Sequence, residues 1–102
     1  MGLWYVESWG VPKAKVKDHE IIFKKWVKRQ ATLLNNEFKY FRKRFGPGIT
    51  RVAMTKFESF TEFDEAFQLL SNDEMNIKLR DEWYLNVEQG TWKGEFWLDI
   101  EI

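Results

Sequence analysis

The sequence contains no cysteine, which excludes disulfides, thiolate zinc sites and cysteine nucleophiles. With a single histidine besides, a haem or zinc site would need carboxylates or a tyrosine to complete it, so we predict neither metal nor cofactor. No apolar run approaches the ~20 residues that a membrane-spanning helix needs. The opening residues, Met-Gly-Leu-Trp-Tyr-Val-Glu, do not have the pattern of a signal peptide. Together these absences predict a soluble, cytoplasmic protein.

Neither sign of charge is in excess. The chain has 16 Lys and Arg against 16 Asp and Glu, a formal net charge of zero at pH 7. This balance removes the usual electrostatic argument for a protein that binds nucleic acid or a membrane surface. A length of 102 residues predicts a single domain over residues 1–102, and 44% hydrophobic residues are enough for a folded core.

Aromatic residues are unusually abundant, with nine Phe, six Trp and three Tyr among the 102 residues. A domain of this size buries only about 60–70% of the surface that its unfolded chain exposes. Eighteen aromatic side chains are therefore hard to accommodate in one small core. We predict a second buried surface, either a homodimer interface or a ligand cavity.

The hydrophobic pattern predicts four strands and two helices. The strands are expected at residues 3–9, 38–45, 49–58 and about 92–101, and the helices at 19–35 and 59–89, the second interrupted at 71–73. Asp18 is expected to cap the first helix, and Gly46-Pro47-Gly48 to form a hairpin turn. Ser59 and Glu62 have the spacing of a capping box, Asp73 can cap the continuation after the break, and Gly90 is expected to close it.

The order β-α-β-β-α-β is that of the ferredoxin-like, or split βαβ, arrangement of the α+β class. Right-handed crossovers place the first and third strands at the centre of the sheet. We therefore predict a four-stranded antiparallel sheet of order 4-1-3-2, with both helices on one face.

Alternation along the strands predicts which side chains lie on the face that the helices leave open. Phe96, Leu98 and Ile100 are the apolar set of the last strand, and with Val52 and Met54 they are expected to face the helices. The open face is then expected to carry Tyr5, Glu7, Trp9, Arg51, Ala53, Thr55, Glu95, Trp97, Asp99 and Glu101. Tyr40/Arg42/Arg44 and Phe41/Lys43/Phe45 are both mixed sets, so the second strand has no clear parity.

This order of elements resembles the dimeric α+β barrel superfamily. The resemblance rests on the aromatic first strand, on Phe-Glu-Ser-Phe-Thr-Glu-Phe-Asp-Glu-Ala at 57–66, and on the break at Asn72-Asp73 followed by Trp83. It is closest to the NIPSNAP-like, EthD-like and stress-responsive barrel proteins and extends over nearly the whole chain. The resemblance implies a homodimer whose two sheets close into a barrel with the helices outside. Members include monooxygenases without a metal, haem-degrading enzymes and small-ligand lyases, but no active-site motif of one subfamily matches.

Three charged residues are the candidates for catalysis. Glu7 and Asp99 are expected on paired strands, with Arg51 on the other neighbour of the first strand. Two carboxylates close together in a dry barrel could raise one pKa and create a general base, while Arg51 bound an anionic or carbonyl group. The alternative is that these charges neutralise one another across strands or across the dimer. Tyr5, Trp9 and Trp97 would form the walls of a ligand pocket, or equally a dry dimer contact.

Two further features have simpler interpretations. His19, at the start of a helix and flanked by Asp18 and Glu20, is expected to be an ordinary surface or partly buried residue.

The basic run at 39–44 is interleaved with aromatics, as in an RNA-recognition module. However, residues 48–57 lack the paired aromatics of that module, and an acidic sheet face would repel phosphates. We therefore expect a solvated edge strand here.

Three classes of function remain open. The first is a small-molecule-binding or cofactor-independent enzymatic protein, in which Glu7 or Asp99 acts as base and Arg51 as anion or oxyanion partner. The second is a non-catalytic homodimeric interaction protein whose aromatic face serves only to dimerise. The third, an RNA-binding module, is the least supported. The expected partners are a second copy of the chain and, for the first class, a small organic ligand.

Overall fold

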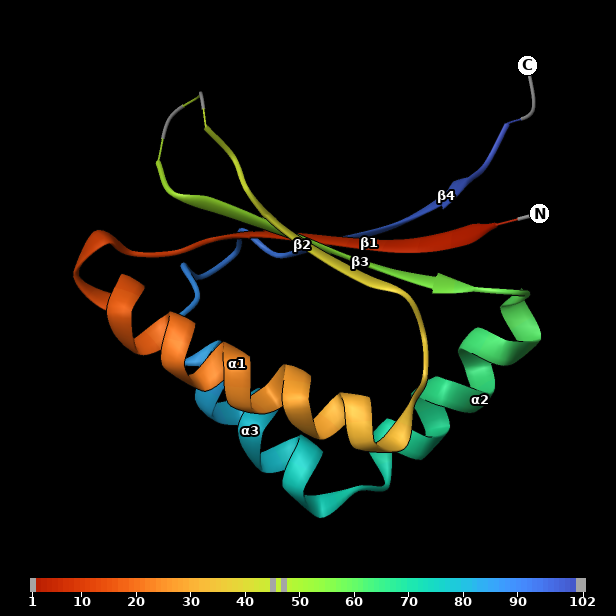
Figure 1. Ribbon diagram of the computed structural model, residues 1–102. Coiled ribbons are helices and arrows are strands. Elements are labelled where there is room, and N and C mark those ends of the chain that lie inside the picture. The colour runs from red at the N-terminus through yellow and green to blue at the C-terminus, as the bar shows by residue number, and fades with distance from the viewer. Residues whose placement is uncertain (1, 45, 47, 101–102) are drawn as a thin grey trace.

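The computed structural model describes residues 2–44, 46 and 48–100 (Figure 1). One antiparallel sheet lies against a layer of helices, and the chain alternates between the two layers. The elements in chain order are β1 (Leu3–Gly10), a 3-10 turn (Lys13–Lys15), α1 (Val16–Leu33), β2 (Phe38–Arg42), β3 (Thr50–Phe57), α2 (Phe60–Ser71), α3 (Glu74–Tyr84) and β4 (Lys93–Leu98).

The sheet has the order β2-β3-β1-β4, so the predicted order 4-1-3-2 and the α+β ferredoxin-like class are confirmed. Leu3 of β1 pairs with Phe57 of β3 on one side and with Leu98 of β4 on the other. Further along β1, Glu7 lies opposite Ala53 and Gly94. All three strand pairs are antiparallel, as the predicted crossovers require.

Helix α1 begins earlier than its pattern predicted. A turn in which the Lys15 amide donates to the Pro12 carbonyl at 2.8 Å leads directly into the helix at Val16. Asp18 therefore lies inside the first turn, and its predicted role as N-cap is wrong. Phe45 and Pro47 of the predicted second strand and turn, and Glu101 and Ile102 at the end of the chain, lie outside the described residues.

The predicted break in the second helix is confirmed and separates α2 from α3. Ser59 Oγ accepts the backbone N–H of Glu62 at 3.1 Å, so Ser59 caps α2 as the spacing predicted, while the Glu62 carboxylate accepts the N–H of Glu58 at 3.0 Å rather than that of Ser59. Asp73 caps α3 by accepting the N–H of Asn76 at 2.8 Å. Helix α3 ends at Tyr84, before the predicted closure, and Gly90 (φ +79°) instead lies in the turn that leads toward β4.

The buried side chains form two separate clusters between the layers. The larger joins α1, α3 and the ends of β1 and β3 that lie near the hairpin, and contains Trp9, Val11, Ile22, Phe23, Trp26, Ala53, Trp83 and Val87. The smaller, built on Leu3, Phe57 and Ala66, lies under α2. The core is thus divided into two parts, and neither cluster fills the space between them.

The predicted parity of β1 and β3 is wrong. Trp9 and Ala53 belong to the core beneath the helices, and Arg51 bonds to Glu20 of α1. Because residues on a strand alternate, Tyr5, Glu7 and Thr55 also face the helices, whereas Val52 and Met54 do not. The prediction failed because both sets of alternating residues in β1 contain aromatic side chains. The charge of Glu7 predicts a place on the face exposed to solvent, whereas Glu7 faces the helices.

The parity of β4 is confirmed. Phe96 packs on Tyr5 and Phe63 on the helical side, with ring centroids 5.2 and 4.9 Å away. Trp97 lies on the open face beside Trp4. That open face also carries Lys39 and Lys56, whose ammonium groups lie 5.2 and 5.6 Å from the Trp4 ring, so it is less acidic than predicted.

No helix within the described residues is long and apolar enough to cross a membrane.

Candidate functional site

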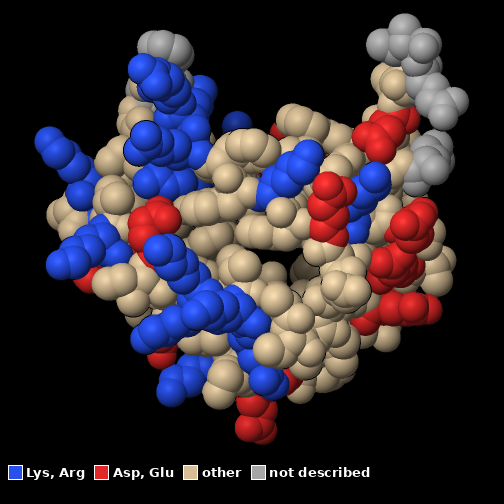
Figure 2. Space-filling model, in the orientation of Figure 1, with Lys and Arg blue, Asp and Glu red and all other residues tan. Residues whose placement is uncertain are grey.

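A cavity of about 570 Å³ lies between the sheet and the helices, in the gap between the two core clusters. A hollow between the layers is visible in the space-filling view (Figure 2). The cavity is lined by Tyr5, Glu7, Trp26, Gln30, Leu34, Thr55, Phe67, Leu70, Ser71, Asn76, Arg80, Asp81, Trp83, Tyr84 and Trp92. Six of these fifteen residues are aromatic, and β1, β3 and all three helices contribute to the wall.

Glu7 projects from the middle of β1 toward this cavity. Its Oε2 accepts the indole N–H of Trp92 at 3.0 Å. Burial raises the pKa of the Glu7 carboxyl above its ordinary value, and the hydrogen bond from Trp92 offsets only part of that shift. A carboxyl group with a raised pKa in a cavity can exchange a proton nearer neutral pH, which is a requirement for a general base or acid.

The residue opposite Glu7 on β4 is Gly94, and its lack of a side chain shapes the site. A Cβ at this position would lie 2.9 Å from the Trp92 ring and 2.9 Å from the Tyr5 hydroxyl. Gly94 therefore lets both aromatic groups close over the strand beside Glu7. Any larger residue here would displace one of them.

Tyr5 places a phenol beside Glu7. Burial, and to a lesser extent the nearby charge of Glu7, raises the pKa of the Tyr5 hydroxyl above its ordinary value. The phenol therefore stays protonated at neutral pH and can donate a hydrogen bond. Its ring is held by Phe63 and Phe96, at centroid distances of 5.0 and 5.2 Å.

The indole N–H groups of the cavity wall are all occupied by protein acceptors. Trp26 donates to Asn76 Oδ1 at 2.7 Å, Trp83 to His19 Nε2 at 3.1 Å, and Trp92 to Glu7. Asn76 is held in turn, because its Nδ2 donates to the Leu70 carbonyl at 2.9 Å. The three tryptophans therefore offer ring surface rather than hydrogen-bond donors to a ligand.

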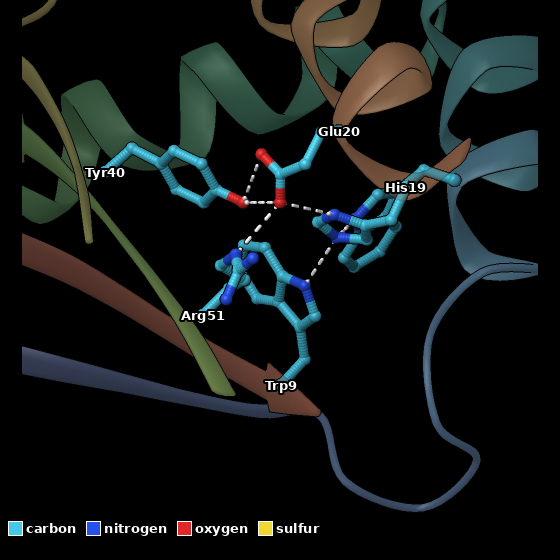
Figure 3. A network of polar contacts seen from close by, with 6 residues as sticks. Trp9, His19, Glu20, Tyr40 and Arg51 are labelled. Atoms are coloured by element: carbon cyan, nitrogen blue, oxygen red, sulfur yellow. Dashed lines mark hydrogen bonds and ion pairs between the residues drawn. The ribbon is translucent and has the colours of Figure 1, made fainter. Parts of the chain in front are cut away.

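A second polar cluster lies behind the cavity wall (Figure 3). His19 Nε2 accepts the indole N–H of Trp9 at 2.8 Å as well as that of Trp83. With Nε2 serving as acceptor, the ring proton lies on Nδ1, which donates to Glu20 Oε1 at 3.1 Å. His19 is fully buried (0% exposed), so its predicted place at or near the surface is wrong.

Glu20 connects this cluster to the sheet. It accepts Arg51 Nε at 2.9 Å and the Tyr40 hydroxyl at 3.0 Å. Burial alone would raise the pKa of Glu20, but the hydrogen bonds from Arg51 and Tyr40 and the charge of Arg51 outweigh it and the pKa is lowered. Burial is also the main reason that the pKa of His19 is lowered. A neutral histidine and an ionised glutamate thus tie α1 to β2 and β3.

The six predicted site residues are distributed over three places. Glu7 and Tyr5 line the cavity. Arg51 belongs to the buried polar cluster and Trp9 to the core behind the wall, and neither lines the cavity. Trp97 and Asp99 lie on the open face of the sheet.

The predicted meeting of Glu7 with Asp99 does not occur. Glu7 pairs with Gly94, five residues before Asp99, whose amide instead donates to the Gly2 carbonyl. At about 3.3 Å per residue this separation is roughly 16 Å along the strand. The Asp99 carboxylate lies 4.0 Å from Lys56 Nζ, on the opposite face of the sheet from Glu7.

Most of the cavity wall was not predicted from the sequence. Trp26 and Trp83 have the periodicity of inward-facing helix residues, which predicts a place in the core, and this is true of their other sides. Trp92 precedes β4, where alternation does not apply. One signal was available: the excess of aromatics over what a small core can hold.

Among the residues that the structure describes, no group of three or more His, Cys, Asp or Glu is arranged to hold a metal ion.

No protein-family model matches the chain, and no curated protein matches its sequence. Solved structures do match. A NIPSNAP family protein from Agrobacterium tumefaciens superposes with a TM-score of 0.85 at 16% identity, over 98% of this chain and 87% of that one. A NIPSNAP domain protein from Burkholderia xenovorans gives 0.82 at 11% identity, over 96% and 94%.

SnoaB from Streptomyces nogalater, described as a cofactor-independent oxygenase, is also similar. It gives a TM-score of 0.73 at 12% identity, over 99% of this chain and 95% of that one. Identities this low show the fold rather than the activity. The chain shares the α+β fold of the NIPSNAP and SnoaB structures.

Proposed function

We propose that this protein binds a small organic ligand in the cavity between the sheet and the helices, with Glu7 as the polar anchor. The observation that carries the proposal is a carboxyl group of raised pKa that faces a 570 Å³ cavity walled by aromatic rings. Cavities of this size with a few polar groups among apolar walls are typical of small-molecule sites. A carboxyl group that only stabilised the fold would be expected to have a cationic partner, whereas Glu7 has the indole of Trp92.

If the site is catalytic, the chemistry requires no cofactor. Glu7 would act as general base toward a weakly acidic C–H or O–H of the ligand, because its raised pKa brings it closer to neutral pH. The Tyr5 phenol would donate a hydrogen bond to an oxygen that gains charge in the same step. Arg51 is bonded to Glu20 outside the cavity, so its predicted role as oxyanion partner is not part of this proposal. The cofactor-independent oxygenase SnoaB shares the fold, which supports chemistry of this kind without identifying it.

The second part of the proposal is a homodimer formed through the open face of the sheet. That face carries Trp97, half exposed (50%) beside the buried Trp4, and Phe41, half exposed (47%) on the opposite edge strand. Aromatic surface left in water on one sheet face is the kind of apolar surface that marks interfaces. Cytoplasmic location remains a prediction from the sequence.

The proposal is tested with Nile red, a neutral apolar dye whose fluorescence rises in apolar sites. We expect saturable binding to the protein, and loss of that binding in Thr55→Phe, because Thr55 lines the cavity and a phenyl ring would fill part of it. Thr61→Phe is the matched control, since Thr61 is exposed on α2 and outside the cavity. A dye that does not bind, or binds both variants equally, would favour the alternative of a purely structural dimer.

A further inference from the structure

Negatively charged side chains outnumber positively charged ones in the cavity lining, and Glu7 is the one that faces inward. Glu7 faces the interior, whereas Arg80 and Asp81 lie on the outer side of α3 with side chains 48% and 67% exposed. Arg80 is paired with Asp81 at 3.3 Å. The described lining therefore has two carboxylates and one guanidinium, and its inward charge is negative.

The tryptophans of the wall offer an anion no free hydrogen-bond donor, whereas hydroxyl and amide groups such as those of Tyr5 and Gln30 can donate as well as accept. The indole N–H groups of Trp26, Trp83 and Trp92 are used by protein acceptors, so none of them remains to bind an anion. Trp92 bonds to Oε2 of Glu7, which leaves the Oε1 atom to accept from a ligand donor. Ring faces carry negative electrostatic potential and attract cations.

From this arrangement we infer that the ligand is an organic cation: an ammonium group on a flat apolar body, with the ammonium at Glu7 and the body among the tryptophans of the wall. The inference rests on the proposed ligand-binding function and adds its chemical class. A ligand ammonium would supply Glu7 with a charge partner that the described lining residues do not, while the surrounding rings replace part of its hydration.

The other two classes of ligand fit less well. A carboxylate or phosphate would meet the Glu7 charge, and the arginine of the described lining is already paired with Asp81. A neutral ligand would bind the walls through its apolar body but leave the ionised Glu7 without a charge partner, which costs free energy in a buried site. The expected order of affinity is therefore cation, then neutral, then anion.

Proton linkage gives a second, independent expectation. Burial raises the pKa of Glu7 in the free protein, so bound protons compete with the ammonium for the carboxylate. The other titratable groups that line the cavity are Tyr5, Tyr84, Arg80 and Asp81. Tyr5 stays protonated because its pKa is raised, and an arginine stays charged, so neither competes between pH 5 and pH 8. Affinity for the cation should rise with pH over the range in which Glu7 ionises.

The experiment uses three probes of nearly equal shape, measured by calorimetry on the full chain at pH 7.5. They are 2-naphthylmethylammonium, 2-naphthylmethanol and 2-naphthoate, which are cationic, neutral and anionic. We expect the ammonium to bind at least tenfold more tightly than the alcohol and the carboxylate to bind most weakly. In Glu7→Gln the ammonium should lose this advantage, while the alcohol should bind at least as tightly as to the wild type, because the unpartnered charge is gone. Glu65→Gln, exposed on α2 and outside the cavity, is the control and should leave all three unchanged.

Each outcome decides a different question. If the alcohol binds as tightly as the ammonium, or if the ammonium keeps its advantage in Glu7→Gln, the cation inference is wrong and the ligand-binding proposal stands. If none of the probes and no dye binds, the ligand-binding proposal itself fails.

Should Glu7→Gln not fold, the wild-type protein still provides the test. The advantage of the ammonium should be smaller at pH 5 than at pH 7.5, and its binding should release protons, whereas the affinity of the alcohol should not fall as the pH is lowered. An advantage that does not change with pH would overturn the inference.

Discussion

Glu7 affects both the stability of the protein and the proposed ligand site, and the direction of its pKa shift fixes how its effect on stability changes with pH. Because the folded-state pKa is raised, the folded protein holds this proton to higher pH than the unfolded chain does. The contribution of Glu7 to stability is therefore fully present below the unfolded-state pKa and is lost as the pH rises through the folded-state pKa. The ionised form of Glu7, which would bind a cationic ligand, is therefore the form that lowers the stability of the ligand-free protein.

We expect Glu7→Gln to gain stability relative to the wild type as the pH rises from 5 to 8. One proton released on unfolding changes the free energy of unfolding by at most about 1.4 kcal/mol per pH unit. Urea denaturation of both proteins at several pH values measures the difference directly. Glu65→Gln, exposed on α2, is the control and should follow the wild-type pH profile. Parallel profiles for wild type and Glu7→Gln would mean that Glu7 is solvated in the folded state.

His19 has the opposite linkage. Its folded-state pKa is lowered, chiefly by burial, so its contribution is present above the unfolded-state pKa and is lost as the pH falls through the folded-state pKa. Protonation would also make Nε2 a donor facing the two indole N–H groups of Trp9 and Trp83. The fold therefore requires a neutral histidine.

We expect His19→Leu to be strongly destabilising, because it leaves two buried indole donors without their acceptor. Each unsatisfied buried donor costs about 1–3 kcal/mol. His19→Gln supplies an acceptor oxygen and should recover part of the loss, which urea denaturation at pH 7.5 would resolve. If the leucine variant is as stable as the glutamine variant, the two hydrogen bonds contribute little and His19 acts by packing alone.

The break between α2 and α3 depends on local capping rather than on a proline or glycine. Ser59 begins α2, and Asp73 both begins α3 and binds Arg29 of α1 through two hydrogen bonds of 2.9 and 2.6 Å. The cap of α3 is thus also its tie to α1. Through Asn76, which holds the indole of Trp26, the position of α3 is linked to the cavity wall.

We expect Ser59→Ala to lower the free energy of unfolding by about 1 kcal/mol, since alanine cannot accept the Glu62 N–H. Ser59→Gly should cost only a few tenths of a kcal/mol, because glycine is tolerated at this position. Thr61→Ala, in the first turn of the same helix and exposed, is the control. A glycine variant less stable than the alanine variant would argue against a capping role.

The elements of this fold were predictable because each has a local signal. The capping box at Ser59 and the break at Asp73 are recognised from a few adjacent residues, and strand order follows from chain connectivity. The faces of β1 were not predictable in this way. Tyr5 and Trp9 alternate with Trp4 and Val6, both sets are apolar, and a shift of one residue exchanges the two faces. The predicted constellation of Glu7, Arg51 and Asp99 depended on that parity and on register, so it failed with them.

The homodimer proposed above would form through the open face of the sheet. We expect the protein to be a dimer in solution by light scattering, and Trp97→Glu to convert it to a monomer. A carboxylate buried without a partner in the interface costs about 3 kcal/mol or more, which raises the dissociation constant at least a hundredfold. Leu85→Glu is the matched control, because Leu85 is 70% exposed on the helical side. A Trp97→Glu protein that stays dimeric would place the interface elsewhere.

The two halves of the chain carry opposite charge, which the net value of zero conceals. Residues 1–56 hold 13 of the 16 Lys and Arg, and residues 57–102 hold 12 of the 16 Asp and Glu, so the halves carry +9 and −9. In Figure 2 the basic side chains gather on the side of α1 and the β2–β3 hairpin, and the acidic ones on the side of α2. Each molecule is therefore an extended dipole with no net charge to keep copies apart.

We expect attraction between molecules at low salt that disappears at physiological salt. The Debye length is about 30 Å at 0.01 M salt, comparable to the 39 Å extent of the molecule, and about 8 Å at 0.15 M. Static light scattering at pH 7 should give a negative second virial coefficient at about 10 mM NaCl and a value near zero or positive at about 150 mM.

The fourfold variant Lys24→Glu, Lys28→Glu, Asp64→Lys, Glu65→Lys keeps the net charge at zero but reduces the halves to +5 and −5. Its low-salt attraction should be clearly weaker, because the separation of charge, rather than its total, drives the association. Equal attraction in both proteins would assign the effect to apolar contacts, and salt would then strengthen it.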